Sequence, residues 1–249
     1  MAFKDHFSAL SADYAAYRPG YPAVLFEYLS GLVAADARVW DCACGSGQAS
    51  VPLSERFGEV YATDASAEQI AVAIPHSNVH YSVASAENSG LPDRSVDLVT
   101  VAQALHWFDL SRFYAEVRRV LKPGGIVAVW SYGVHHVDDT AIDAHMQDFY
   151  RNTIGPYWPP ERRLVEEGYR TLDFPFAELQ VPPMAMEATW TLLQLLGYLR
   201  SWSAVGRYER EKGQDPVAAF AAFAAEIAPL WHGETCRINW PLAVRVGRL

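Results

Sequence analysis

A turn that combines a carboxylate with glycines follows the first apolar run of the chain. In residues 39–48 (VWDCACGSGQ), Asp41 ends the run, and Gly45 and Gly47 lead into a segment of helical character. Glycine adopts positive φ without steric cost and lets the backbone approach a ligand closely, while the N-terminus of a following helix offers unpaired N–H groups. The pattern suits a ligand-binding loop, although an ordinary strand–turn–helix corner has the same features.

The same turn lacks the residues of two common phosphate-binding motifs. The dinucleotide fingerprint G-x-G-x-x-G requires glycine at position 50, where this chain has Ser50. A P-loop requires Gly-Lys followed by Ser or Thr, and no such sequence follows Gly47. A P-loop is therefore excluded.

Two more polar segments end predicted strands. Asp64 closes the run EVYATD, seventeen residues after Gly47, where a carboxylate is well placed to accept both hydroxyls of a ribose. Asp64 also fits as the N-cap of the helix that follows, and one loop can serve both roles. Residues 84–88 (ASAEN) can hydrogen-bond an adenine edge or form a solvated loop.

The elements that would position these residues alternate along the first half of the chain. Apolar runs predict strands at 38–42, 59–63, 79–84, 96–101 and 126–131, and amphipathic segments predict helices at 22–34, 48–57, 66–74 and 111–121. This order predicts an α/β fold with a doubly wound, Rossmann-like sheet and helices on both faces. Ligands of such sheets bind beyond the carboxyl ends of the strands.

The second half of the chain has a different pattern. Residues 134–170 are polar and mostly helical, 174–181 and 238–246 favour strands, and 190–231 favour helices. Two strands separated by a helical block predict an antiparallel pair at the sheet edge. We expect one domain over residues 1–249, with a seven-stranded sheet whose last strand is antiparallel and a helical cap insertion over residues 188–232.

Composition narrows the function. The net charge of −9 argues against sequence-independent binding of nucleic acid and against a basic membrane-binding face. The only cysteines are Cys42, Cys44 and Cys236, too few and too poorly spaced for a disulfide scaffold or a metal site, which favours a reducing compartment. Without a signal-like or 18-residue apolar run, the chain is expected to be cytoplasmic, as a monomer or homodimer.

The motifs in their order resemble a known family. DCACGSGQ, YATDAS, SAENSGLPDRSVDLVTVAQALHWFD and VRRVLKPGGIVAVWS together look like a class I S-adenosylmethionine-dependent methyltransferase. The opening DYAAYRPGYP and the AQALHWFD segment are similar to the small-molecule group that includes the trans-aconitate methyltransferases. The resemblance covers residues 1–132 well and the second half loosely. It implies S-adenosylmethionine as cofactor and no metal.

The resemblance also implies roles for individual residues. Asp41 is expected near the methionine amino group, Gly45 and Gly47 beneath the cofactor, and Asp64 at the ribose. One departure is Ala43, where the family usually has glycine; alanine requires negative φ or extra room. The expected cofactor-binding residues are Tyr17, Arg18, Asp41, Ala43, Gly45, Gly47, Asp64, Ala65, Ala86, Glu87, Ala102 and Gln103.

Candidate acceptor-binding residues lie after the fourth strand and in the aromatic-rich parts of the chain. His106 can act as a base, orient the acceptor or bond a loop, and Trp107 can line a pocket or pack. Tyr21 and Trp202 are further candidates. Residues 1–21 resemble the family's cofactor lid, with permanent packing on the core as the alternative. The adjacent His135 and His136 point apart in an extended chain, which disfavours a metal site.

The sequence thus predicts a methyltransferase acting on a small-molecule acceptor, with a carboxylate or a hydroxyl as the candidate group. A base is needed only if the attacking atom carries a proton at neutral pH. Two alternatives stay open: a non-catalytic S-adenosylmethionine-binding partner protein, and a nucleotide-cofactor oxidoreductase, against which Ser50 and the KPGG segment count.

Overall fold

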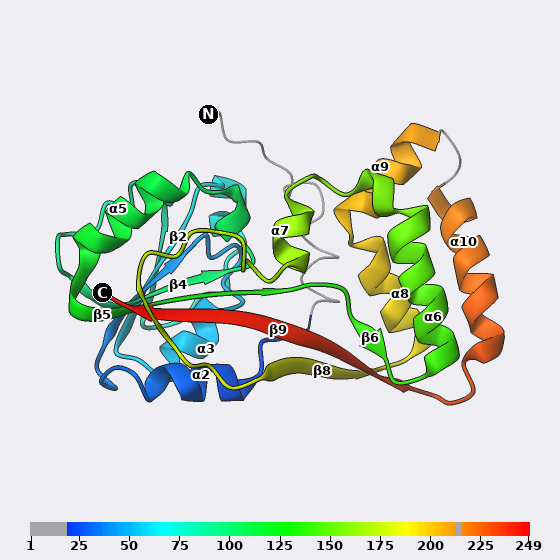
Figure 1. Cartoon of the computed structure of the whole chain (residues 1–249), viewed down its shortest axis with the longest axis horizontal. Helices are drawn as coiled ribbons and strands as arrows, with labels where there is room; N and C mark the ends of the chain where they lie inside the picture. Colours follow the sequence, from blue (N-terminus) through cyan, green and yellow to red (C-terminus); the bar gives the residue numbers. More distant parts are fainter. Residues whose placement is uncertain (1–18, 213–215) are drawn as a thin grey trace.

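A mixed β-sheet occupies one end of the molecule and a group of helices the other (Figure 1). The long strand β9 (Cys236–Arg248) extends from the sheet toward those helices. This computed structural model describes residues 19–212 and 216–249. The proposed lid over residues 1–21, including Tyr17 and Arg18, therefore falls almost entirely outside the described residues.

Five parallel strands form the first part of the sheet, in the order β3-β2-β1-β4-β5. They are β1 (Arg38–Cys42), β2 (Glu59–Asp64), β3 (Val79–Val83), β4 (Val96–Ala102) and β5 (Leu121–Tyr132). The order reverses direction at β1, between β2 and β4. Their carboxyl ends therefore lie together at one edge, which is where the candidate site residues follow each strand.

The remaining four strands complete the sheet beyond β5 through the antiparallel strand β9. Strand β9 pairs with β5 on one side, and β6 (His136–Val137) continues that side. On its other side, β9 pairs with β7 (Ala177–Leu179) and β8 (Met184–Trp190). The predicted α/β class and antiparallel last strand are confirmed. The sheet has nine strands and not the seven predicted. Strands β5 and β6 share one position beside β9, and β7 and β8 share the position on its other side, so nine strands occupy seven positions.

Helices cover both faces of the parallel strands. One face packs Val39, Val60 and Leu98 against α2 (Ala23–Ser30) and α3 (Ser50–Ser54). The other face packs Trp40 and Val99 against α5 (Leu110–Val120) and α7 (Arg162–Glu166). Consecutive residues of a strand point to opposite faces, so a run such as Val39-Trp40 fills both cores. This explains why the strands read as continuous apolar runs.

Local signals fix where several helices begin. Ser66 precedes α4 (Ala67–Ala71) and its hydroxyl accepts the N–H of Gln69, while Asp109 precedes α5 and accepts the N–H of Arg112. These are the N-cap contacts that satisfy the first free N–H groups of a helix, each contributing about 1 kcal/mol. The short 3₁₀ turn η2 (Leu105–Trp107) bridges β4 and α5.

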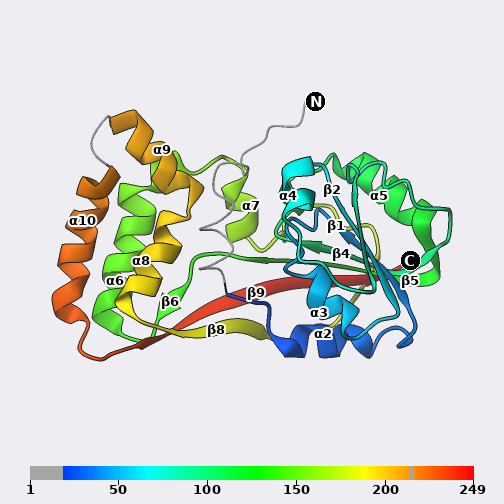
Figure 2. The same cartoon turned by 180° about the vertical axis from the view of Figure 1, so that it is seen from behind.

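A third core joins the helices at the far end of the molecule. It contains α6 (Thr140–Asp148), the π-helical η3 (Phe149–Thr153), α8 (Leu192–Arg200), α9 (Ser203–Lys212) and α10 (Pro216–Ile227). Seen from behind, α8 and α6 lie between β8 and α10 (Figure 2). Two short 3₁₀ turns, η4 (Gly155–Tyr157) and η5 (Ala228–Leu230), connect these elements. No helix within the described residues is long and apolar enough to cross a membrane.

Candidate functional site

The turn after β1 has an unusual backbone. Ala43, Gly45 and Gly47 all have positive φ, at 55°, 55° and 94°. Of the two expectations for Ala43, negative φ or extra room, the first does not hold, because its φ is positive. For alanine the left-handed region costs roughly 1–2 kcal/mol. The turn keeps its left-handed shape despite the missing glycine, because the strand before it and the hydrogen bonds around it hold the chain.

Gly47 is required by the protein's own packing. A Cβ at this position would overlap the hydroxyl of Tyr81 and lie 3.1 Å from the ring carbon that carries it. Tyr81 projects from β3, and its hydroxyl donates to the carbonyl of Ile74 at 2.9 Å. At Gly45, by contrast, a Cβ would meet nothing closer than 3.8 Å. Gly47 thus allows the close approach of β3, and Gly45 supplies only the positive φ.

Asp41 lies fully buried beneath the turn. Its two carboxylate oxygens accept the hydroxyls of Ser50 at 2.6 Å and Thr100 at 2.9 Å. Burial raises the pKa of Asp41 to about 6, an effect that the two hydroxyl donors oppose and that the charge of Asp64 adds to. The carboxylate therefore joins the start of α3, β1 and β4 in one network under the glycine turn.

Asp64 connects the tips of β1 and β2. One carboxylate oxygen accepts the N–H of Gly45 at 2.9 Å and the other accepts the N–H of Ser66 at 2.8 Å. These two bonds connect the carboxylate to the turn after β1 and to the N-cap of α4. Ala65 follows at the surface. Asp64 and the Asp41 network thus meet at the glycine turn, as the strand order requires.

The tips of β3 and β4 bring the other expected residues to the same edge. Ala86 is buried, and the carboxylate of Glu87 accepts the N–H of Asp109 at 3.2 Å. Gln103 has a φ of 57°, and its side-chain amide donates to the carbonyl of Tyr132 at 2.9 Å. Ala102 ends β4 immediately before it. The described part of the predicted cofactor set therefore follows four neighbouring strands.

His106 lies on η2, beside the same edge. Its Nδ1 is 2.8 Å from the hydroxyl of Tyr169, a fully buried residue just after α7. Burial, helped by the nearby charge of Arg162, lowers the pKa of His106 to about 3. Arg162 lies over the ring of Trp158 at 4.6 Å and donates through Nε to the hydroxyl of Tyr150 at 2.8 Å. His106 is therefore neutral at physiological pH.

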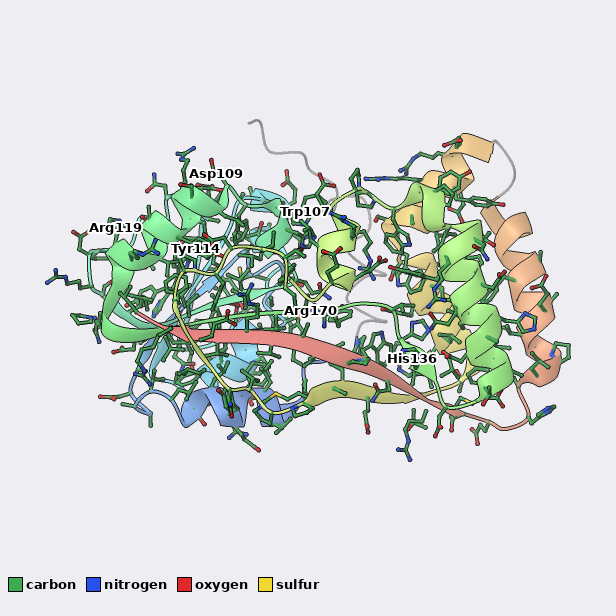
Figure 3. The ribbon with its side chains drawn as sticks, viewed as in Figure 1. Trp107, Asp109, Tyr114, Arg119, His136 and Arg170 are labelled. Carbon is green, nitrogen blue, oxygen red and sulfur yellow. The ribbon has the colours of Figure 1, made fainter. Side chains whose placement is uncertain are left out.

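The other acceptor candidates occupy different places. Trp107 is 37% exposed and lies beside α7, between the sheet and the helical end (Figure 3). Tyr21 packs edge-on against Trp130 of β5, with ring centroids 5.5 Å apart. Trp202 is buried at the start of α9, 5.6 Å from the ring of Trp158. Trp107 contacts His106 directly, with ring centroids 4.6 Å apart, and Trp202 is linked to Arg162 through Trp158.

The adjacent histidines point apart, as expected. His135 is fully buried among Tyr198, Trp202 and Trp240, and neither ring nitrogen has a hydrogen-bond partner. Burial lowers its pKa to about 3. His136 is exposed and lies 3.2 Å from a carboxylate oxygen of Asp143. Across residues 19–212 and 216–249, no group of three or more His, Cys, Asp or Glu side chains is arranged to hold a metal ion.

Comparisons with known proteins agree with this geometry. The methyltransferase domain family matches residues 40–129. A protein of Dictyostelium discoideum assigned as a methyltransferase is 32% identical over 217 residues, covering 86% of this chain and 82% of its own. The chain belongs to the class I S-adenosylmethionine-dependent methyltransferases. This membership decides against the oxidoreductase alternative.

Two further relatives cover almost the whole methyltransferase. The structure of a protein assigned as a type II methyltransferase from Anaeromyxobacter dehalogenans matches with a TM-score of 0.87 and 46% identity, covering 93% of this chain and 98% of that one. The Saccharomyces cerevisiae protein CRG1, a probable S-adenosylmethionine-dependent methyltransferase by name, is 26% identical over 94% of this chain and 91% of its own. The likeness therefore includes the helical end of the molecule.

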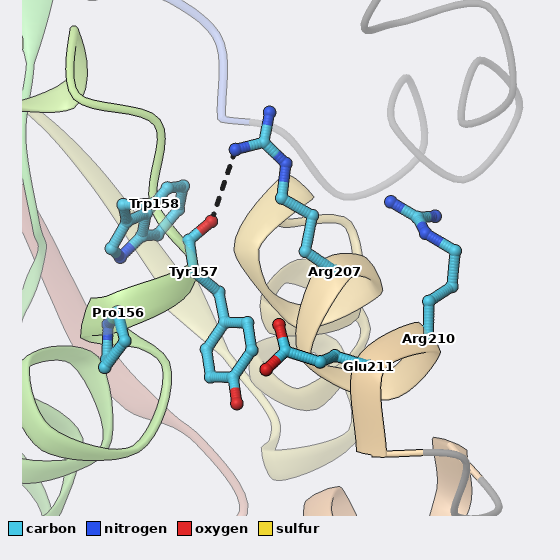
Figure 4. Close-up of a pocket in the computed structure, with 6 residues that line it drawn as sticks. All are labelled: Pro156, Tyr157, Trp158, Arg207, Arg210 and Glu211. Carbon is cyan, nitrogen blue, oxygen red and sulfur yellow. Dashed lines mark hydrogen bonds between the residues drawn. The ribbon is translucent and has the colours of Figure 1, made fainter.

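A surface pocket lies on the helical end of the methyltransferase. Its lining comes from η4 and α9, with Arg207 donating to the carbonyl of Tyr157 at 3.4 Å (Figure 4). Trp158 lines this pocket and also lies under the guanidinium of Arg162. The residues that line it are Pro156, Tyr157, Trp158, Arg207, Arg210 and Glu211.

Sequence reasoning missed several residues of the site. The sequence predicts no contact of Ser50 or Thr100 with Asp41, although the hydroxyls of both donate to its carboxylate. Tyr169 and Arg162 lie about sixty residues after His106 in a segment that predicted only polar helix. No local pattern signals such contacts, because the fold alone brings α7 against η2.

Proposed function

We propose that this methyltransferase transfers the methyl group of S-adenosylmethionine to a small molecule held between the carboxyl edge of the sheet and the helical cap. S-adenosylmethionine supplies a methyl carbon already activated by its sulfonium. Asp64 would bind the ribose hydroxyls, Ala86 and Glu87 would border the adenine, and the 43–47 turn with Gln103 would border the methionine. The left-handed backbone at these positions fits such a close approach.

The protein's contribution to such a transfer is to align the reactants and keep water out. The helices α8, α9 and α10, which fall within the predicted cap insertion of residues 188–232, would enclose the acceptor. His106 and Trp107 follow β4 at the edge where an acceptor would meet the methyl group. We place Trp202 and Tyr21 on the walls of the acceptor site, on the side away from Asp64.

One observation carries the proposal of a small-molecule acceptor. Buried polar atoms without hydrogen bonds gather among aromatic rings where the sheet meets the cap: both nitrogens of His135, Nε1 of Trp158 and Oε1 of Gln147. Buried polar groups are nearly always paired, so such atoms need an explanation. Apolar walls with a few convergent polar groups are typical of small-molecule sites. The acidic net charge of −9 further disfavours nucleic acid as acceptor.

The proposal is tested by following an isotope-labelled methyl group. The protein is incubated with S-adenosylmethionine carrying a labelled methyl and with a cell extract separated into small-molecule, protein and nucleic-acid fractions. We expect label to appear in the small-molecule fraction with the wild type and to be lost with Asp64→Ala. Label that enters only protein or nucleic acid would contradict the proposal.

A further inference from the structure

The backbone of Tyr169 lies in the left-handed region, which its neighbours in the fold must stabilise. It follows Gly168 after α7, and both residues have positive φ, 59° for Tyr169 and 62° for Gly168. A left-handed conformation is unfavourable for a bulky residue other than glycine. Arg245 of β9 holds the segment by donating to the carbonyls of Tyr169 and Leu172, each at 2.8 Å. Strain of this kind is concentrated at functional sites.

The left-handed backbone at Tyr169 places the phenol ring of this residue beside His106. The hydroxyl of Tyr169 lies 2.8 Å from Nδ1 of His106, and the ring centroids are 5.8 Å apart. Burial raises the pKa of Tyr169, against the opposing effects of the charge of Arg162 and of the backbone amides of Leu105 and His106. Within the described residues, Nδ1 is the one hydrogen-bond partner of this fully buried hydroxyl. A hydroxyl that accepted from Nδ1–H would leave its own proton unpaired, so the phenol donates to Nδ1.

A proton donated to Nδ1 determines the state of the whole imidazole. Nδ1 must then be unprotonated, so a neutral ring carries its proton on Nε2. We propose that Tyr169 is a positioning residue that fixes His106 as an Nε2–H hydrogen-bond donor, and that His106 therefore orients the acceptor and is not its base. This inference rests on the proposed function for the identity of the group that receives the bond.

The surroundings of His106 indicate which acceptors suit such a donor. The side chain of Arg162 is only 19% exposed, and its charge acts on both His106 and Tyr169. Its Nε bonds Tyr150, and the carboxylate of Glu166 is 3.8 Å away. A hydrogen-bond donor that feels the charge of a nearby cation favours an anionic oxygen. Methylation of such an oxygen forms a C–O bond, breaks the S–C bond, leaves its electron pair on sulfur and releases no proton. No base is then required.

Nuclear magnetic resonance of protein with ¹⁵N-labelled histidine tests the assignment without an acceptor or turnover. Correlations between ring nitrogens and ring protons distinguish the two neutral tautomers and the cation. We expect His106 at pH 7 to be neutral with the proton on Nε2, its signals identified by their absence in His106→Gln. A proton on Nδ1, or a doubly protonated ring, would overturn the proposal.

Two phenol variants separate positioning from packing. Tyr169→Phe should abolish the single tautomer of His106, giving a mixture. Tyr114→Phe removes another buried hydroxyl, which bonds the carbonyl of Asp173 at 2.7 Å, and should leave the His106 signals unchanged. A folded Tyr169→Phe protein with the wild-type tautomer would overturn the role of Tyr169. If Tyr169→Phe does not fold, the wild-type spectrum still decides the protonation of Nε2.

Once an acceptor is known, two variants of His106 distinguish a donor from a base. Glutamine keeps an N–H donor near the position of Nε2 but cannot accept a proton, and leucine does neither. We expect kcat of His106→Gln to fall less than about tenfold and that of His106→Leu to fall much further. Equal losses of about 10²–10⁴ in both variants are the result expected of a general base and would overturn the proposal.

Discussion

Buried polar side chains bond to one another at the tips of β1, β2 and β4, whereas beyond the middle of β5 many do not. Asp41, Ser50 and Thr100 form a closed network, and Trp40 donates through its indole N–H to Thr63 at 2.9 Å. Among the described residues, every buried side-chain polar atom without a partner lies in residues 130–158. The turn after β1, where we propose that the cofactor binds (the cofactor end), thus has its buried polar side chains paired, while residues 130–158, which include the proposed acceptor site (the acceptor end), retain polar atoms for which the described residues supply no partner.

The unpaired polar atoms of residues 130–158 lower the stability of the folded protein. An unpaired buried donor or acceptor costs roughly 1–3 kcal/mol, a large share of a typical domain's stability. Such a cost is tolerated where it serves function. Variants at the cofactor end should therefore change stability and cofactor affinity together, and variants at the acceptor end should separate stability from cofactor affinity.

The largest effect is expected for Gly47→Val. Positive φ at this position resists a β-branched residue, and the side chain would overlap Tyr81. Overpacking and left-handed strain together cost about 2–5 kcal/mol, so we expect lower thermal stability and no measurable binding of S-adenosylhomocysteine in calorimetry. Gly47→Ala should be partly rescued by Tyr81→Phe. No rescue would mean that the glycine keeps space for the ligand and not for Tyr81.

Asp64→Ala should weaken S-adenosylhomocysteine binding by about 10- to 150-fold, the equivalent of a charged hydrogen bond of roughly 1.5–3 kcal/mol. The matched control is Asp97→Ala, since Asp97 also accepts a backbone N–H, that of Arg38 at 2.9 Å, but at the opposite end of the sheet. The control should keep wild-type affinity. Equal affinity losses in both variants would mean that Asp64 acts through the loop alone.

His135→Phe should stabilise the protein by about 1 kcal/mol or more at pH 7.5, because a ring without polar atoms replaces two unpaired nitrogens. Its affinity for S-adenosylhomocysteine should be unchanged. A loss of stability on chemical denaturation would show that His135 has a partner that the folded chain supplies.

The same variant should reduce the acid sensitivity of folding. His135 has a pKa of about 3 in the folded protein against an ordinary value of 6.5, so the unfolded chain binds its proton first and stability falls as pH drops below 6.5. The loss reaches about 2 kcal/mol at pH 5. Asp41 acts in the opposite direction, since its pKa is raised to about 6. Comparing wild type with His135→Phe between pH 7.5 and 5 isolates the histidine; parallel curves would refute this.

The smallest effect is expected for Ala43→Gly. Glycine relieves left-handed strain of about 1–2 kcal/mol but adds chain entropy worth about 0.5–1 kcal/mol to the unfolded state. We expect a net gain in stability of up to about 1 kcal/mol, with cofactor affinity equal or higher. Weaker binding in a folded Ala43→Gly protein would show that the methyl group itself contributes to the site.

The sequence predicted the parallel strands and the glycine turn of the first half. Strand β1 was predicted with its observed bounds, and Asp41 and Asp64 lie at the carboxyl ends of β1 and β2, because buried parallel strands and glycine turns leave local patterns. Strand β8 was missed: its burial alternates along the strand, but it forms by pairing with β9, a contact distant in sequence. The contact between Tyr169 and His106 was missed for the same reason, since it depends on tertiary packing.

Hydrogen–deuterium exchange with saturating S-adenosylhomocysteine tests most directly whether the cofactor binds at the carboxyl ends of β1, β2 and β4 and not at the cap helices. The account predicts slower exchange in peptides that contain residues 41–47, 64–66 and 102–103, with smaller changes in those from α8 to α10. Unchanged exchange at 41–47 and 64–66, or protection confined to the cap helices, would contradict it.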